Sequence, residues 1–206
     1  MKDDVDRLTP LGLMVLALLD EGDMHPYEMI RLMRLRRDDR LVAITNGSMY
    51  HTVARLERAG LLAEIGVDRA GNRPERTTYS VTDAGARAVT EWVRRELPQV
   101  DRPAEFRVAL AEAHNLDREE VVSLLRTRRE ALAAGLGALT DGHDLACAKG
   151  VPAQYLLEID RDLTLRSAEL GWLDGLLARL VHPDFIWGSH TEPSERYLAQ
   201  RKAARQ

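Results

Sequence analysis

A short amphipathic segment that ends at a glycine and runs directly into two strand-like segments is the feature that most constrains the fold of this chain. Residues 47–59 repeat the apolar side chains Met49, Val53 and Leu56 at spacings of four and three, which predicts a helix with one buried stripe. Gly60 ends that helix, since glycine adopts the left-handed conformation at little cost. The strand-like segments LLAEIGV and RPERTTYSV follow, with the turn residues DRAGN between them, so we expect a hairpin.

Three further helices are expected around this unit. Thr9 and Pro10 predict the start of a first helix, and its sequence, PLGLMVLALLD, is apolar on nearly all sides. A second helix is expected over residues 26–37 and a fourth over residues 83–97. Residues 9–97 then have the order helix, helix, helix, hairpin, helix, which predicts a winged helix-turn-helix with a two-stranded wing.

The rest of the chain is expected to be helical, so the fold class is mainly α. A short helix is predicted over residues 104–114, and Asp117 with Glu120 predicts a capping box at the start of a long helix. Residues 141–152 contain turn-forming residues, although residues 144–149 are also compatible with a continued helix.

A heptad pattern distinguishes residues 154–181. Such a pattern predicts a long helix that packs against other helices, and we expect the partner to be a second copy of the chain. We therefore divide the chain into a DNA-binding domain, residues 1–97, and a helical dimerisation domain, residues 98–206, which ends in a polar terminal helix. The two seams of the pattern are Leu156, Leu163, Leu170 and Leu177, and Ile159, Arg166, Leu173 and Leu180.

Charge is distributed unevenly along the chain. The net charge is −4, yet residues 31–76 hold ten arginines against six acids, whereas residues 1–30 hold two bases and seven acids. Binding to phosphate depends on the local field, so a basic segment in an acidic protein favours a nucleic-acid partner. Arginines on solvated helix faces are the plain alternative.

Three sequence features indicate the cellular compartment: the length of the longest apolar run, the charge of the N-terminus and the number of cysteines. The longest apolar run, residues 11–19, is too short to span a bilayer, and the acidic N-terminus differs from a secretory signal. A single cysteine suits a reducing compartment. We expect a cytoplasmic protein without membrane partners.

Two groups of polar side chains are candidates for contact with double-stranded DNA. A helix fits the major groove, and arginines at a hairpin tip reach phosphates or the minor groove. A solvated helix face is the alternative for the first group, and core packing is an equal alternative for Tyr50. The helix candidates are Ser48, Tyr50, His51, Thr52 and Arg55, with Arg55 expected to reach a guanine edge or a phosphate, and the wing candidates are Arg69, Asn72, Arg73 and Arg76.

Several motifs together resemble the PadR family of transcriptional regulators, in its long form with a multi-helix C-terminal domain. They are LTPLGLMVLALL near the start, HPYEM (25–29), GSMY (47–50), LERAGLL (56–62) and TTYSVTDAG (77–85). The resemblance implies a homodimer, DNA binding through paired winged helices, and repression relieved by a small-molecule effector. His51 stands where relatives often have proline, so base preference is expected to differ.

Candidates for an effector site are fewer. Aromatic and charged residues near a subunit junction can line a ligand cavity, whereas core packing, or for the arginine a solvated head group, is the alternative. The effector candidates are Met14, Trp92, Arg166 and Trp172.

Catalytic and metal chemistry have no support in the sequence. His143 and Cys147 are four residues apart, but two ligands do not make a metal site, and no catalytic motif occurs. We therefore expect no enzyme, metal or cofactor. The alternative function is a winged-helix protein–protein interaction module that does not bind DNA, and a small ligand-binding helical protein is a third possibility.

Overall fold

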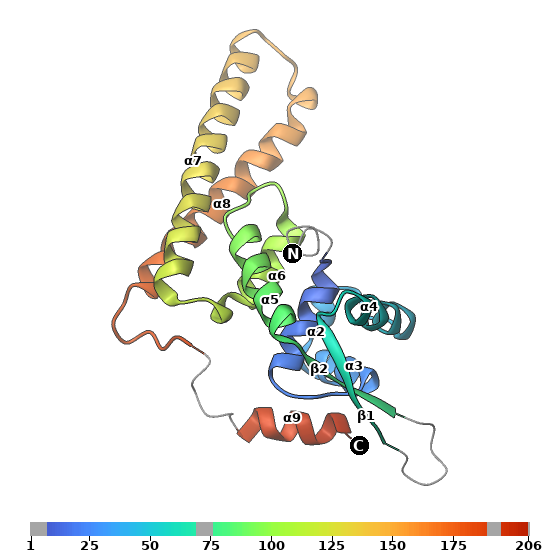
Figure 1. Cartoon of the computed structure of the whole chain (residues 1–206). Coiled ribbons are helices and arrows are strands. Elements are labelled where there is room, and N and C mark those ends of the chain that lie inside the picture. Colours follow the sequence, from blue (N-terminus) through green and yellow to red (C-terminus); the bar gives the residue numbers. More distant parts are fainter. Residues whose placement is uncertain (1–7, 69–75, 189–194, 206) are drawn as a thin grey trace.

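The structure is a computed structural model that describes residues 8–68, 76–188 and 195–205 (Figure 1). Three helices, a two-stranded antiparallel sheet and a further helix form the first half, which confirms the expected winged helix-turn-helix order. The elements are α2 (Pro10–Asp20), α3 (Pro26–Arg36), the 3-10 turn η1 (Asp38–Arg40), α4 (Asn46–Arg58), β1 (Leu62–Asp68), β2 (Arg76–Val81) and α5 (Asp83–Glu96).

Helices dominate the second half as well. α7 and α8 lie side by side as an antiparallel pair that projects away from the wing, and α9 returns to lie next to α3 (Figure 1). The elements are α6 (Pro103–Ala111), η2 (Ala113–Asn115), α7 (Arg118–Ala148), η3 (Ala153–Tyr155), α8 (Leu157–Leu180) and α9 (Glu195–Arg205).

Threonine side chains start three helices of the winged-helix part. Thr9 Oγ1 accepts a hydrogen bond from the backbone N–H of Gly12 at 3.2 Å, and Thr45 and Ser48 cap each other reciprocally at the start of α4. Thr82 Oγ1 accepts from the N–H of Gly85 at 3.1 Å. These caps satisfy backbone donors that would otherwise lack partners, and they explain why the helix starts could be predicted.

Two glycines fix the path into and out of the hairpin. Gly60 has a φ of +70°, in the left-handed region that favours glycine. A Cβ at Gly85 would lie 2.0 Å from the carbonyl oxygen of Leu61. The close approach of α5 to the start of β1 therefore requires glycine at position 85.

The sheet joins the wing to the helical core. β1 and β2 pair antiparallel from Leu62 opposite Val81 to Asp68 opposite Arg76, with a register shift between Glu64 and Gly66. Met24 extends the sheet by a bridge to Tyr79, with both N–H to carbonyl distances at 3.1 Å. The loop between α2 and α3 is thereby attached to the wing.

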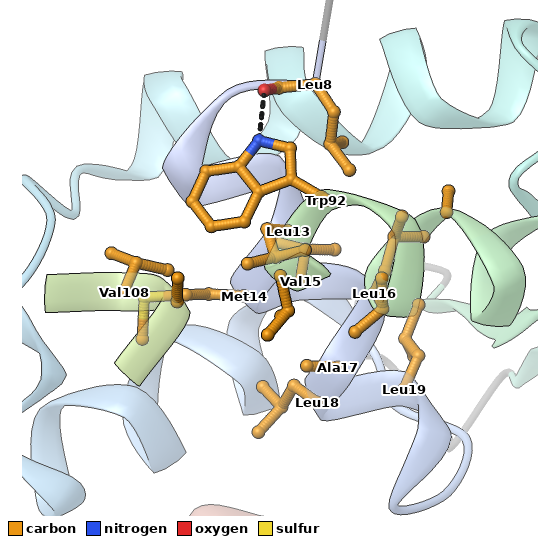
Figure 2. Close-up of a cluster of buried hydrophobic side chains, with 14 of the residues drawn as sticks. Leu8, Leu13, Met14, Val15, Leu16, Ala17, Leu18, Leu19, Trp92 and Val108 are labelled. Carbon is orange, nitrogen blue, oxygen red and sulfur yellow. Dashed lines mark hydrogen bonds between the residues drawn. The ribbon is translucent and has the colours of Figure 1, made fainter. Parts of the chain in front are cut away.

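Helix α2 forms the centre of the core. Its side chains from Leu13 to Leu19 are all buried (Figure 2), because α4, α5, α6 and β2 all pack against it. Trp92 of α5 is fully buried, and its indole N–H donates to the carbonyl oxygen of Leu8 at 3.1 Å. This packing accounts for the apolar character of α2 on nearly all sides.

One local expectation in the second half is wrong. Asp117 is the N-cap residue of α7, but its side chain makes no cap hydrogen bond. Glu120 instead pairs with Arg94 of α5, and this hydrogen bond lowers the pKa of Glu120.

Of the two alternatives for residues 141–152, the continued helix is the one observed. α7 runs to Ala148 against α8, and Gly150 then turns the chain with a φ of +72°.

A buried arginine fastens the α7–α8 pair to the rest of the molecule. Arg128 of α7 is only 1% exposed, and its guanidinium lies 3.5 Å from the ring centre of Phe106 on α6. The guanidinium also donates to Glu169 of α8 and to the carbonyl oxygen of Gln99, between α5 and α6. Four segments therefore meet at one charged group.

Candidate nucleic-acid interface

The outward face of α4 carries a continuous stripe of exposed residues. Their spacings of three, one, three and four place them on one side of a helix. Tyr50 is 49% exposed and projects from this stripe. We call this set the outer stripe of α4; it consists of Gly47, Tyr50, His51, Ala54 and Arg58.

The opposite side of α4 faces the core and includes one residue expected on the polar face. Met49, Val53 and Leu56 are buried, as predicted. Thr52 is also buried, with 6% of its surface exposed. It lies three residues after Met49 and four before Leu56, so helical geometry places it with them.

Ser48 and Arg55 are partly buried and make contacts within the protein. The Ser48 hydroxyl accepts from the N–H of Thr45 at 3.1 Å, so it holds the first turn of α4. Arg55 donates from Nη2 to Thr9 Oγ1 at 2.9 Å, which ties α4 to the start of α2. Both side chains hold α4 in position, and the residues of the outer stripe are exposed to solvent.

Three residues of the outer stripe were not among the candidates drawn from the sequence. Gly47 and Ala54 have little or no side chain, and Arg58 follows Ala54 by one turn and donates from Nε to its carbonyl oxygen at 3.1 Å. Extending the spacing from His51 by three and then four residues would have found Ala54 and Arg58. Gly47 and Ala54 have no polar side chain, so polarity alone does not mark them as exposed.

The wing candidates lie at the edge of what the structure describes. Arg69, Asn72 and Arg73 fall outside the described residues, and Arg76 opens β2 but its side chain is not described. The two strands that lead to them are described, and Ile65 of β1 is 53% exposed.

The four effector candidates occupy two separate environments. Met14 and Trp92 belong to the core around α2 (Figure 2). On α8, Arg166 donates from Nε to Asp162 at 2.9 Å, and Trp172 is 45% exposed and meets the edge of Phe106 at a ring distance of 6.4 Å. The structure does not bring the four side chains together.

A separate hollow of about 340 Å³ lies where four segments meet. The end of α2, one face of α5, the turn from η2 to α7 and the segment after α8 enclose it. None of the four effector candidates lines it.

Other functional classes receive no support from the described residues. No group of three or more His, Cys, Asp or Glu side chains in this part of the chain is arranged to hold a metal ion. None of the helices that the structure describes has the length and apolar character that a membrane crossing requires.

Comparison with known proteins gives one family match and several similar solved structures. Residues 15–91 match the model of the transcriptional regulator PadR-like family. PadR of Bacillus subtilis in complex with operator DNA is 21% identical, with a TM-score of 0.39, and the match covers 82% of this chain and 98% of that one. The protein smu.1604c of Streptococcus mutans UA159 is 20% identical, with a TM-score of 0.38 and coverage of 81% and 98%. PadR of Bacillus subtilis in complex with p-coumaric acid is 18% identical, with a TM-score of 0.37 and coverage of 84% and 100%.

No curated protein gives a significant match. The family match spans most of α2, the helices α3 and α4, the hairpin and the first part of α5. It confirms the resemblance drawn from the sequence motifs: residues 15–91 of the chain match the PadR-like family of transcriptional regulators.

Proposed function

We propose that this protein is a sequence-specific regulator of transcription that inserts the outer stripe of α4 into the major groove of double-stranded DNA. The observation that carries the proposal is the uncovered stripe itself, on the third helix of a winged helix-turn-helix. A helix in this position enters the major groove, and the hairpin that follows reaches the flanking backbone.

The composition of the outer stripe suits close contact with bases. Gly47 and Ala54 let the backbone of α4 approach the groove floor, and the Ala54 methyl group can pack against a thymine methyl. Tyr50 and His51 offer hydrogen-bonding groups between these two small residues. Arg58 lies at the last turn of α4, where its guanidinium can reach a guanine edge or a phosphate.

Ser48 and Arg55 have a supporting role in this proposal. Their hydrogen bonds to Thr45 and Thr9 fix the start and the lateral position of α4. A recognition helix must be held rigidly for its side chains to distinguish bases. Replacing either residue should weaken binding to all DNA sequences and change base preference little.

The protein is proposed to act as a homodimer. Large apolar side chains on α8 remain exposed, including Leu157 at 66%, Leu165 at 48% and Trp172 at 45%. A second copy of the chain would cover this surface, and two copies of α4 would then read a palindromic site. Repression released by a small molecule follows if the ligand favours a dimer whose two α4 helices are wrongly spaced.

Selection of bound duplexes from a random pool tests the proposal. We expect enrichment of a palindromic site, and His51→Ala should reduce preference for it over scrambled duplex by at least about fivefold, since one lost base contact costs about 1–3 kcal/mol. His182→Ala is the matched control, because His182 is exposed and lies beyond α8. Absence of any enriched site would instead favour the protein-interaction module.

A further inference from the structure

We infer that the hollow between α2, α5, η2 and the segment after α8 binds a small organic cation, an ammonium group attached to a flat apolar ring. The role of this hollow as the effector site rests on the proposed function. Binding of the cation does not depend on that function. The hollow measures about 340 Å³, within the range of small-molecule sites in proteins.

The walls of the hollow come from segments far apart in the sequence. Asp20 ends α2, and Val89 and Thr90 belong to α5. Asn115 ends η2, Asp117 is the N-cap residue of α7, and Trp187 follows α8. A ligand here would contact the winged-helix part and the start of the α7–α8 pair at once. Its binding would therefore depend on how these parts are arranged.

An apolar surface forms part of the lining. Val89 and Leu116 are buried, with 3% and 5% of their surface exposed. The indole N–H of Trp187 donates to the carbonyl oxygen of Leu116 at 2.9 Å, so the ring is held in place and offers a ligand its apolar surface. Such a wall fits a flat ring, and an aromatic face also attracts cations.

The charges around the hollow select the sign of the ligand. Asp20 and Asp117 both line it, whereas no lysine or arginine among residues 8–68, 76–188 and 195–205 does. Within the described residues, neither carboxylate forms an ion pair or a side-chain hydrogen bond, and Asp117 does not cap α7 although it is the N-cap residue. Two carboxylates without partners disfavour an anionic ligand and favour an ammonium group.

Helix α2 adds a second electrostatic reason. Asp20 is its last residue, and its last turn contains no basic residue. A carboxylate beside the negative end of a helix is unfavourable. Asp20 is itself exposed, and a bound cation would relieve this repulsion at the end of the helix.

The remaining polar groups can orient the ligand. The Thr90 hydroxyl and the Asn115 amide line the same hollow. Asn115 Nδ2 already donates to the carbonyl oxygen of Glu112 at 2.9 Å, which leaves its amide oxygen as an acceptor. His114 also lines the hollow, with Nδ1 lying 3.2 Å from the carbonyl oxygen of Ala111.

Calorimetric titration of the full chain with three probes of similar shape tests the inference. The probes are 2-phenylethylamine, which is an ammonium ion at neutral pH, the neutral 2-phenylethanol and the anionic 3-phenylpropanoate. We expect the amine to bind at least about tenfold more tightly than the alcohol, a difference of about 1.4 kcal/mol. The carboxylate should give no saturable heat.

Substitutions then locate the site. The double variant Asp20→Asn with Asp117→Asn should reduce the affinity for the amine to that for the alcohol, while Asp101→Asn, an exposed aspartate outside the hollow, should change nothing. Unchanged circular dichroism and melting would establish that the double variant is folded. Equal binding of amine and carboxylate, full affinity in the double variant, or no saturable binding of the amine at millimolar concentration would each overturn the inference.

A DNA-binding assay separates this inference from the proposed function. The amine should change the affinity for the selected duplex in the wild-type protein and leave it unchanged in the double variant. Duplex binding with no calorimetric response to the amine would overturn only the inference. A calorimetric response in a protein that binds no duplex would overturn only the proposed function.

Discussion

The winged-helix part and the α7–α8 pair are both helical, but they bury their side chains to very different extents. Helix α2 spans 11 residues, of which those from Gly12 to Leu19 are all buried. Helix α8 spans 24 residues and buries only Leu173 and Leu180. A helix that is covered on all sides has buried its apolar surface within the protein. A long helix with exposed leucines and an exposed tryptophan would bury its apolar surface only against a further partner. We therefore expect the first part to supply most of the stability and, under the proposed homodimer, the second part to supply the contact between the two copies.

The largest expected effect is on stability and follows from the two tryptophans. Trp92→Ala should lower the free energy of unfolding by about 3–5 kcal/mol, because Trp92 is fully buried and its N–H bonds to Leu8. Trp172→Ala, with a side chain 45% exposed, should cost much less. Urea titration followed by circular dichroism measures both, and equal losses would remove the distinction between the two parts.

Self-association should be sensitive to substitutions on α8 and not to substitutions in the winged-helix part. Leu165→Glu puts a charge on the exposed face of α8, and we expect it to weaken dimerisation by about 2 kcal/mol or more, which is roughly thirtyfold. Sedimentation velocity at several protein concentrations measures the change. Leu35→Glu, on an exposed leucine of α3, is the control and should leave the dimer intact. A dimer of unchanged affinity in Leu165→Glu would show that the exposed face of α8 is not the dimer contact.

Helix α9 tests whether the two parts are independent. Tyr197 packs under the guanidinium of Arg36 at 5.2 Å, and Arg201 lies 3.9 Å from Glu28. A chain that ends after Gly188 should therefore lose about 1–2 kcal/mol of stability. Backbone amides of α3 should exchange faster with solvent, while those of α7 should not change. Lys202→Ala, an exposed residue of α9, serves as the control.

The smallest effect concerns pH. Burial raises the pKa of Glu112 above its ordinary value, so the folded protein binds this proton more readily than the unfolded chain does. Stability from this group therefore increases as the pH falls through the raised pKa, and it stops increasing below the pKa of the unfolded chain. Glu112→Gln should reduce the rise in melting temperature between pH 7 and about pH 5. If the rise in melting temperature were unchanged in Glu112→Gln, other carboxyl groups would be its source.

Local signals explain what could be predicted from the sequence. Thr9, Thr45 and Thr82 each cap a helix through atoms no more than three residues away, so their role can be read without knowledge of the tertiary structure. The order of helices and hairpin in the winged-helix part was recognisable for the same reason. A capping contact in the second half was predicted wrongly because the partner is distant in the sequence: Glu120 pairs with Arg94, and α7 begins after Asp117 without the expected capping box.

The candidate interface was predicted less completely than the fold. His51 and Tyr50 are exposed as expected, but Thr52 faces the core and Arg55 binds Thr9. Polarity alone does not decide which side of a helix is covered, because that depends on which neighbours pack there. The small residues Gly47 and Ala54 carry no chemical signal of their own and became visible only through their exposure.

The contact of α9 with α3 closes the chain into a ring, since the helical second half joins the winged-helix part at α5–α6 and again at α9. The second half is therefore attached to the winged-helix part through two segments far apart in the sequence, and loss of the α9 contact would leave the α5–α6 attachment in place.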